Sequence, residues 1–270
     1  MTSAQMAGLP EDVPLKVEGV ALAIQVNRRH LNLAIFLSRP LHTFKMDDHY
    51  GDLNLQMLHL PWAQLRCLEL NSGQLHSMSR VIGLLRQCTS LEVCLLSLYL
   101  IPNAESDGVI GEVMPTVTLP ILRKLTIHMG SNAKNLCALS HFLLPSLRIL
   151  EIDGGEWTYN IREVFRRHLN LHQLHELDIA RVNNSPTIVS ILKDAPLLRR
   201  LSLPPHAMFD EECLRGLGNG HLGRNLELLK LHARSCNADD ISKMVEARLK
   251  TRKLIPGIAP LFQVHQIPGG

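Results

Sequence analysis

The sequence has few aromatic residues, no marked excess of one charge and no long apolar run. Phe, Trp and Tyr number only 6, 2 and 3 in 270 residues. The 28 basic and 25 acidic side chains give a formal charge of +3, without the concentrated basic face that nucleic-acid binders carry. The longest apolar run, Val93 to Ile101, contains Ser97 and is too short to span a bilayer. We therefore expect neither a nucleic acid nor a membrane as partner.

The amino-terminal residues and the cysteines indicate in which cellular compartment we expect the protein. The first residues, MTSAQMAGLPEDV, lack the basic start and the apolar core of a signal peptide. The 6 cysteines, at positions 67, 88, 94, 137, 213 and 236, show no close pairs and no C-x-x-C motif. We expect free thiols and a location in the cytoplasm or nucleus, where thiols stay reduced.

Leucine, in contrast, supplies 50 residues, and its positions repeat. The segment L-R-C-L-E-L at 65–70 has the form L-x-x-L-x-L, which we call the kernel. Exact or looser copies of the kernel begin at residues 41, 65, 91, 122, 147, 174, 198 and 226, so successive starts lie 24 to 31 residues apart. Leucine-rich repeats share this kernel and a period of roughly 20–29 residues.

The kernel and the segments between kernels predict alternating strands and helices. The last two apolar residues of each kernel are two apart, so they lie on one face of a short strand. Between kernels, apolar residues recur at helical spacing, in one stripe at 81, 84, 85 and 88 and in another at 136, 139 and 143. Because one such unit cannot bury its own apolar stripe, the units must stack. The predicted fold is a curved α/β solenoid with a parallel β-sheet on the concave face and helices on the convex face.

Local signals mark the ends of the helices. Ser185-Pro186, Asp210 and Asn237 occupy positions expected for helix starts. Prolines at 61, 120, 145 and 196 each precede a kernel by a few residues and stop the preceding helix. The asparagine that usually follows the third leucine of such repeats is absent, so the repeats are irregular.

The repeat pattern divides the chain into three parts. Residues 1–40 are an N-terminal segment or a degenerate first repeat, because Val20 and Leu22 lie 24 residues before Phe44 and Met46. Residues 41–250 are the leucine-rich-repeat domain, with a loop insertion at N-A-E-S-D-G (103–108). Residues 251–270, which contain I-P-G-I-A-P and a final P-G-G, are expected to form a loose tail.

Several strings resemble the repeat region of F-box proteins from mushroom-forming fungi. They are L-P-W-A-Q-L-R-C-L-E-L, L-L-R-Q-C-T-S-L-E, F-L-L-P-S-L-R-I-L-E-I and D-I-S-K-M-V-E-A-R-L, spread over residues 41–250. In that family an N-terminal F-box docks on a ubiquitin-ligase adaptor, and the repeats hold substrates. Leu9-Pro10-Glu11-Asp12 looks like the opening of an F-box, but Pro14 interrupts the helix that should follow. We therefore expect that the F-box itself is missing, and that any ligase component is bound through a segment outside this sequence.

Two patterns bear on cofactors and metals. Gly218-Asn-Gly-His-Leu-Gly223 matches G-x-G-x-x-G, but it follows a helical stretch and precedes a kernel, the reverse of a dinucleotide site. A flexible helix-to-strand loop with Gly218 at the helix end is the interpretation that fits. Zinc needs three or four ligands that converge on one point. His168 lies at an expected helix end and His175 on an expected strand, and no Cys or carboxylate stands at a supporting spacing, so we interpret these two and His172 as surface histidines near turns. We expect no catalytic site, metal or cofactor.

The kernel positions that face away from the core give the candidate binding site. Glu151, Asp153, Glu176 and Asp178 fall on neighbouring strands about 4.8 Å apart, so we expect an acidic patch. Such a patch would attract a basic protein surface, although an ordinary solvated face remains the alternative. The full set of candidate binding residues is Lys124, His128, Glu151, Asp153, Glu176, Asp178 and Arg200.

Two functions follow from the sequence. The first is a non-catalytic protein-binding module that resembles the substrate-recognition part of an F-box ubiquitin-ligase receptor and holds an unidentified protein. The alternative is a stand-alone leucine-rich-repeat scaffold or inhibitor unrelated to ubiquitination. An F-box encoded upstream would favour the first.

Overall fold

The structure is a computed structural model that describes residues 20–21, 41–48, 60–72, 78–98, 116–129, 136–157, 159–183, 187–232, 237–255, 257–259 and 263–267. The chain divides into two compact units. The first comprises Met1–Ala133 with His141–Pro145, and the second comprises Lys134–Ser140 with Ser146–Gly270.

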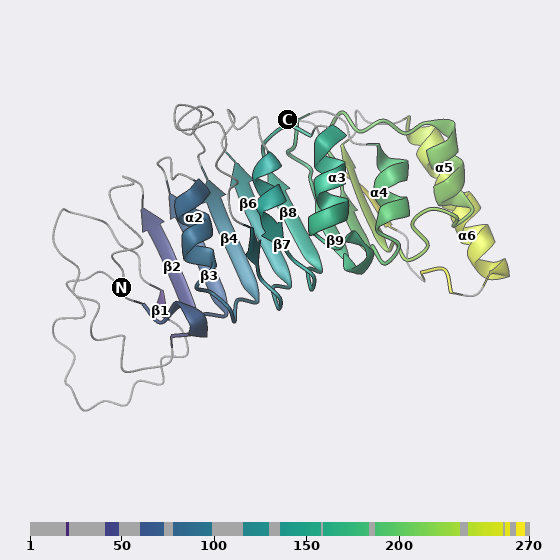
Figure 1. The fold of residues 1–270 in the computed structure, drawn as a ribbon. Helices are drawn as coiled ribbons and strands as arrows, with labels where there is room; N and C mark the ends of the chain where they lie inside the picture. Colours follow the sequence, from purple (N-terminus) through teal and green to yellow (C-terminus); the bar gives the residue numbers. More distant parts are fainter. Residues whose placement is uncertain are drawn as a thin grey trace. The chain divides into compact units, whose positions relative to one another are not determined.

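The first unit contains a parallel sheet with helix α2 (Met78–Leu85) on one side (Figure 1). In spatial order its strands are β1 (Val20–Ala21), β2 (Thr43–Asp48), β3 (Cys67–Ser72), β4 (Val93–Leu98) and β6 (Lys124–Met129). The 3-10 helix η3 (Trp62–Gln64) leads into β3. A separate two-stranded parallel sheet joins β5 (Val117–Thr118) to β7 (Phe142–Leu143).

The second unit repeats the same two layers. Its parallel strands, in spatial order, are β8 (Ile149–Asp153), β9 (Glu176–Asp178), β10 (Arg200–Ser202), β11 (Leu228–His232) and β12 (Gln263–Ile267). The helices that follow β8 to β11 in turn are α3 (Tyr159–His168), α4 (Ile188–Asp194), α5 (Glu211–Gly218) and α6 (Ala238–Leu254). The 3-10 helices are η4 (Leu136–His141), which precedes β7, and η5 (Leu171–Gln173), which precedes β9. A mixed α/β fold with mostly parallel strands is therefore confirmed.

The apolar residues of the kernels form the cores of both units. All three apolar positions of all eight kernels are buried, each with an exposed fraction of 4% or less. The strand register places equivalent kernel positions side by side: Leu68 pairs with Phe44 and Cys94 in the first unit, and Leu177 pairs with Leu201 in the second. The prediction that these residues face the core is thus correct at every kernel. It needed only the local sequence, because successive side chains of a strand point to opposite faces.

A backbone hydrogen-bond pattern recurs where the strands begin. The N–H groups of Arg66 and Cys67 both donate to the carbonyl of His42, at 2.8 and 2.9 Å. Paired donation of this kind recurs at the same kernel position, to the carbonyls of Arg66, Glu92, Arg148, His175 and Arg199. The first leucine of a kernel also donates to the carbonyl three residues earlier, as Leu174 does to Leu171 at 3.0 Å. Successive strand entries thus have the same backbone geometry.

Two of the predicted helix starts are confirmed. Asp210 caps α5 by accepting a hydrogen bond from the Cys213 N–H at 2.7 Å, and Asn237 caps α6 by accepting one from the Asp239 N–H at 3.2 Å. Helix α4 begins after Thr187, whereas Ser185 and Pro186 lie outside the described residues. The predicted F-box opening at 9–14 and the insertion at 103–108 also lie outside them.

Two expectations need correction. The segment 251–270 is not simply a loose tail, because α6 continues to Leu254 and β12 pairs with β11 in parallel. The stripe at 136, 139 and 143 is not one helical face: η4 ends at His141, and β7 then exposes Leu143 (37%) while Phe142 and Leu144 are buried. Residues 41–250, the expected repeat domain, extend over both compact units.

Candidate functional site

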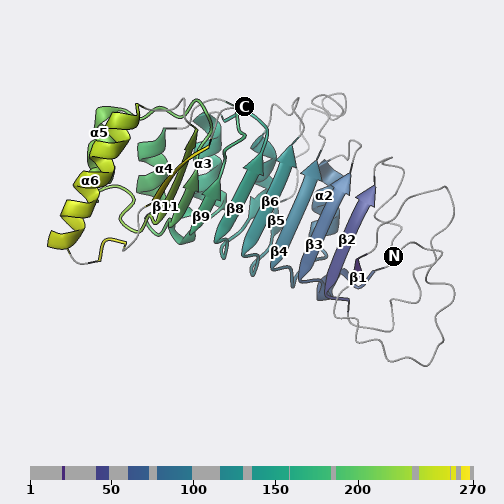
Figure 2. The same ribbon diagram turned by 180° about the vertical axis from the view of Figure 1, so that it is seen from behind.

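Each sheet has a side that faces away from the helices, which we call its open face. In Figure 1 the helices α2, α3 and α4 lie in front of the strands, and Figure 2 shows the strands from the opposite side. Among the described residues, no helix lies over the strands on that side of either sheet. The side chains at the outward kernel positions lie on the open faces; most are half-buried or exposed, whereas Thr126 and Ser202 are buried.

The sequence-predicted carboxylates lie together on the open face of the second unit. Glu151 pairs in register with Asp178, which places two like charges directly opposite each other on adjacent strands. Glu176 lies two residues before Asp178 on β9, opposite Ile149, and Asp153 ends β8. All four side chains are half-buried.

Two of these carboxylates are neutralised by arginines. Glu176 pairs with Arg200 on β10 at 3.3 Å, and Asp153 pairs with Arg181, which follows β9, at 2.7 Å. The Asp178 carboxylate accepts a hydrogen bond from the Ala180 N–H at 3.1 Å, closing the turn after β9. The expected acidic residues therefore lie beside arginines, and Glu151 and Asp178 stand directly opposite each other among them. Ion pairs at the surface, such as these between an exposed arginine and a half-buried carboxylate, contribute only about 0–1 kcal/mol to stability.

The row of paired residues that contains Glu151 and Asp178 continues across the sheet to a basic residue. Asp178 pairs in register with Ser202, and Ser202 pairs with Lys230 on β11. Ser202 is buried with an exposed fraction of 6%, although it lies on the open face. Across the four strands, the row consists of the carboxylates of Glu151 and Asp178, the hydroxyl of Ser202 and the ammonium group of Lys230. A partner whose basic and acidic groups match this order would be held in one orientation.

Lys124 and His128, the other candidates, lie on the open face of the first unit. Both side chains are half-buried on β6, with buried Thr126 between them. They therefore belong to a different compact unit from the four carboxylates. Arg181 was missed by the sequence reasoning, because it lies beyond the kernel and only the strand register brings it to Asp153.

The glycine-rich segment is held by a buried arginine of α6. The Arg248 side chain has an exposed fraction of 1%, and its guanidinium donates to the carbonyls of Leu217, Gly223 and Leu226 at 2.8, 2.7 and 3.3 Å. Burial lowers the pKa of Arg248 to about 10, which still leaves it charged at neutral pH. Rather than a flexible loop, the segment is an ordered turn that packs on α6.

The three histidines are spread over different elements. His168 ends α3, His172 lies in η5 and His175 precedes β9. In the part of the chain that the structure describes, no three His, Cys, Asp or Glu side chains are placed to hold a metal ion. Cys88 and Cys94 are buried as free thiols, and burial raises the pKa of Cys88 to about 12, so this thiol stays protonated at neutral pH.

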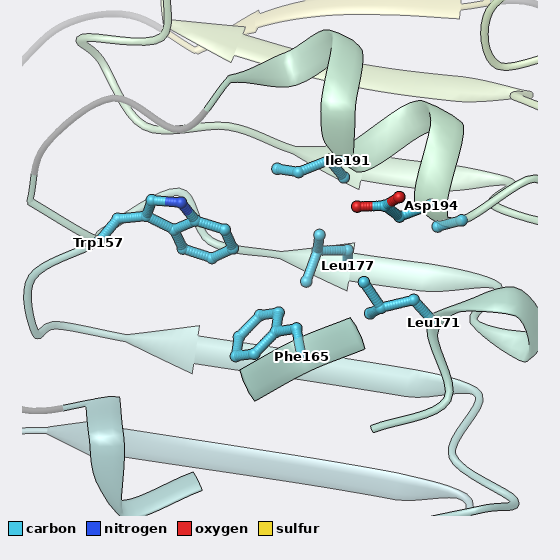
Figure 3. A pocket seen from close by; sticks show the side chains of 7 residues that line it. Trp157, Phe165, Leu171, Leu177, Ile191 and Asp194 are labelled. Atoms are coloured by element: carbon cyan, nitrogen blue, oxygen red, sulfur yellow. The ribbon is translucent and has the colours of Figure 1, made fainter. Parts of the chain in front are cut away.

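A small cavity lies between helices and sheet of the second unit. Figure 3 shows Trp157, Phe165, Leu177 and Ile191 around it, and Trp157 meets Phe165 edge to face with ring centroids 5.0 Å apart. Its volume of about 10 Å³ has room for about one water molecule. Small-molecule sites are roughly 300 Å³ or larger, so this cavity is a gap in side-chain packing.

Neither the cavity nor the histidines provide a reactive arrangement, so the open faces remain the candidate site. No helix in the described ranges is long and apolar enough to cross a membrane. A scan against family models and a search of curated proteins found no match to this chain, and the functional argument therefore rests on the side chains of the open faces.

Proposed function

We propose that this chain is a leucine-rich-repeat solenoid that binds another protein without catalysis, in the cytoplasm or nucleus. It would serve as the substrate-recognition part of a receptor similar to F-box ubiquitin-ligase receptors. The in-register kernels and the recurring paired donation to one carbonyl support the solenoid, because identical units that stack must repeat their backbone contacts.

The observation that carries the binding proposal is the opposed pair of carboxylates, Glu151 and Asp178. Like charges on adjacent strands repel mildly and add nothing to folding. A lysine or arginine of a partner removes this repulsion and gains attraction. The pair therefore gives the open face of the second unit a preference for basic protein surfaces.

Changing the sign of this pair tests the proposal. We expect the double variant Glu151→Lys with Asp178→Asn to bind its partner at least about tenfold more weakly, through lost attraction and slower association. Asn at 178 keeps an oxygen that can accept from the Ala180 N–H, so the turn is preserved. The partner is first captured with the full chain and identified by mass spectrometry, and its affinity is then measured by calorimetry at two salt concentrations.

Glu212→Lys is the matched control, because Glu212 is an exposed carboxylate on α5 and not on the sheet. It should leave the affinity unchanged, and both variants should melt like the wild type. Normal binding by the double variant would show that the acidic pair is only a solvated surface.

A further inference from the structure

The turn between α5 and β11 contains the only asparagine of the chain that is followed by glycine, Asn219 before Gly220. Such pairs are prone to spontaneous deamidation, in which the peptide nitrogen of the glycine attacks Cγ of the asparagine. Glycine has no Cβ to keep its own nitrogen away from the preceding side chain. Both residues are half-buried rather than enclosed, so water has access to the amide. The conformation of the turn therefore decides how fast the reaction proceeds.

The Asn219 side chain is directed toward the backbone that follows it. Its Oδ1 accepts a hydrogen bond from the His221 N–H at 3.0 Å, which closes a small turn around Gly220. Attack of a nitrogen on Cγ places negative charge on this same oxygen. An N–H that donates to the oxygen beforehand stabilises that charge, as the donors of an oxyanion hole do in enzymes. The carbonyl side of the pair therefore favours the reaction.

The nitrogen side of the pair, in contrast, is held back in the folded chain. The Gly220 N–H donates to the Leu217 carbonyl at 3.3 Å, and Asn219 has φ −90° and ψ 0°. At this ψ the Gly220 nitrogen lies on the side of the Asn219 nitrogen rather than on the side of its Cβ. The peptide between the two residues has to rotate before its nitrogen reaches Cγ, and this requires a local opening of the turn.

Arg248 of α6 resists this opening. Its guanidinium donates to the carbonyls of Leu217 and Gly223, at 2.8 and 2.7 Å, and these two residues flank the Asn219-Gly220 pair in the sequence. The Leu217 carbonyl is also the group that accepts from the Gly220 N–H. The Arg248 side chain is only 1% exposed, so water cannot easily replace the bonds that an opening of the turn would break. The reactive conformation is therefore rare while α6 is in place.

We propose that Asn219 is a deamidation site of the folded protein, and that the contact between Arg248 and the turn sets its rate. The Gly220 nitrogen forms a bond to Cγ of Asn219 and loses its proton to solvent. The bond from Cγ to Nδ2 breaks, and Nδ2 takes up a proton and leaves as ammonia. The succinimide that remains adds one water molecule and opens to aspartate or isoaspartate, with no change of oxidation state.

Both products change the turn. Each places a carboxylate at the C-terminal end of α5, which is the negative end of the helix dipole. In isoaspartate the main chain runs through the former side chain and gains a carbon atom. The carbonyls of Leu217 and Gly223 then lose the spacing that Arg248 fits. Conversion therefore weakens the contact that delays it, and it loosens α6 in the converted molecules.

Peptide mass spectrometry of the full chain tests the inference, after several weeks at physiological temperature and mildly alkaline pH. Trypsin cleaves after Arg215 and Arg224 and releases residues 216–224, in which Asn219 carries the only side-chain amide. The next peptide, 225–230, carries Asn225, which precedes leucine and serves as an internal control. We expect conversion at Asn219 alone of these two. Its rate in the folded chain should be at least about tenfold below that in the urea-unfolded chain.

Substitutions of Arg248 test the role of its contact with the turn. Arg248→Met should raise the rate of conversion in the folded chain about tenfold, because the turn opens more often. Arg248→Lys should raise it less, because its ammonium group still donates to one carbonyl.

Lys250→Met is the matched control, since Lys250 is exposed on the same helix and should leave the rate unchanged. If Arg248→Met fails to fold, Arg248→Lys decides the outcome. Equal rates in the wild type and the Arg248 variants would overturn the inference. It would also be overturned if Asn219 stays an amide in the folded wild type, converts there as fast as in the unfolded chain, or converts no faster than Asn225.

Discussion

Replacing Arg248 by methionine is expected to lower the free energy of unfolding by about 2–4 kcal/mol. Methionine fills much of the space of the arginine stem but cannot donate to the carbonyls of Leu217 and Gly223, which Arg248 contacts at 2.8 and 2.7 Å. A hydrogen bond to a charged group contributes roughly 1.5–3 kcal/mol, and the removed cost of burying the charge offsets part of the loss. Helix α6 should then separate more easily from the turn after α5.

Urea unfolding followed by tryptophan fluorescence measures this change. The chain has 2 tryptophans, and Trp157 lies in the second unit, so a Trp62→Phe background reports the unit that contains Arg248. Lys250→Met, two residues along the same helix at an exposed position, is the matched control and should change stability by less than about 0.5 kcal/mol. Arg248→Lys should be intermediate, because a single ammonium cannot reach carbonyls on both sides of the turn. An unchanged urea midpoint for Arg248→Met would show that α6 is held by its apolar contacts alone.

Truncating Leu150 to alanine is expected to cost about 2–5 kcal/mol, from lost burial and the cavity that remains. Leu150 has an exposed fraction of 0% and pairs in register with buried Leu177, so few atoms can move into the space. The same Trp62→Phe background and urea titration report the change.

Leu197→Ala makes the identical chemical change at a leucine of the same unit that is 44% exposed, and it should cost far less. Equal effects of the two substitutions would mean that Leu150 does not occupy a closely packed position. The kernel register would then be incorrect.

At the candidate site, the sequence predicts the orientation of side chains along each strand but not the contacts between strands. The orientation of Glu151 and Asp178 follows from alternation along each strand, which depends only on neighbours in the chain. Contacts between strands do not follow from the local sequence. Arg181, which comes after β9, forms an ion pair with Asp153 at the end of β8, and Ser202 is buried although its position on the strand predicts exposure. Cross-strand contacts of this kind require the register and the depth of the face, and both are properties of the folded sheet.

The sequence by itself determined the kernel positions, their burial and the caps at Asp210 and Asn237, because each depends on residues within one turn or strand. Only the tertiary structure decided the roles of Arg248 and β12. Arg248 has no local feature that distinguishes it from exposed Lys250 and Arg252, and its burial follows from the carbonyls that the turn after α5 leaves facing α6. Strand β12 carries no leucine kernel, and it forms because the edge of β11 offers backbone hydrogen-bonding groups, which pair with little regard to side chain.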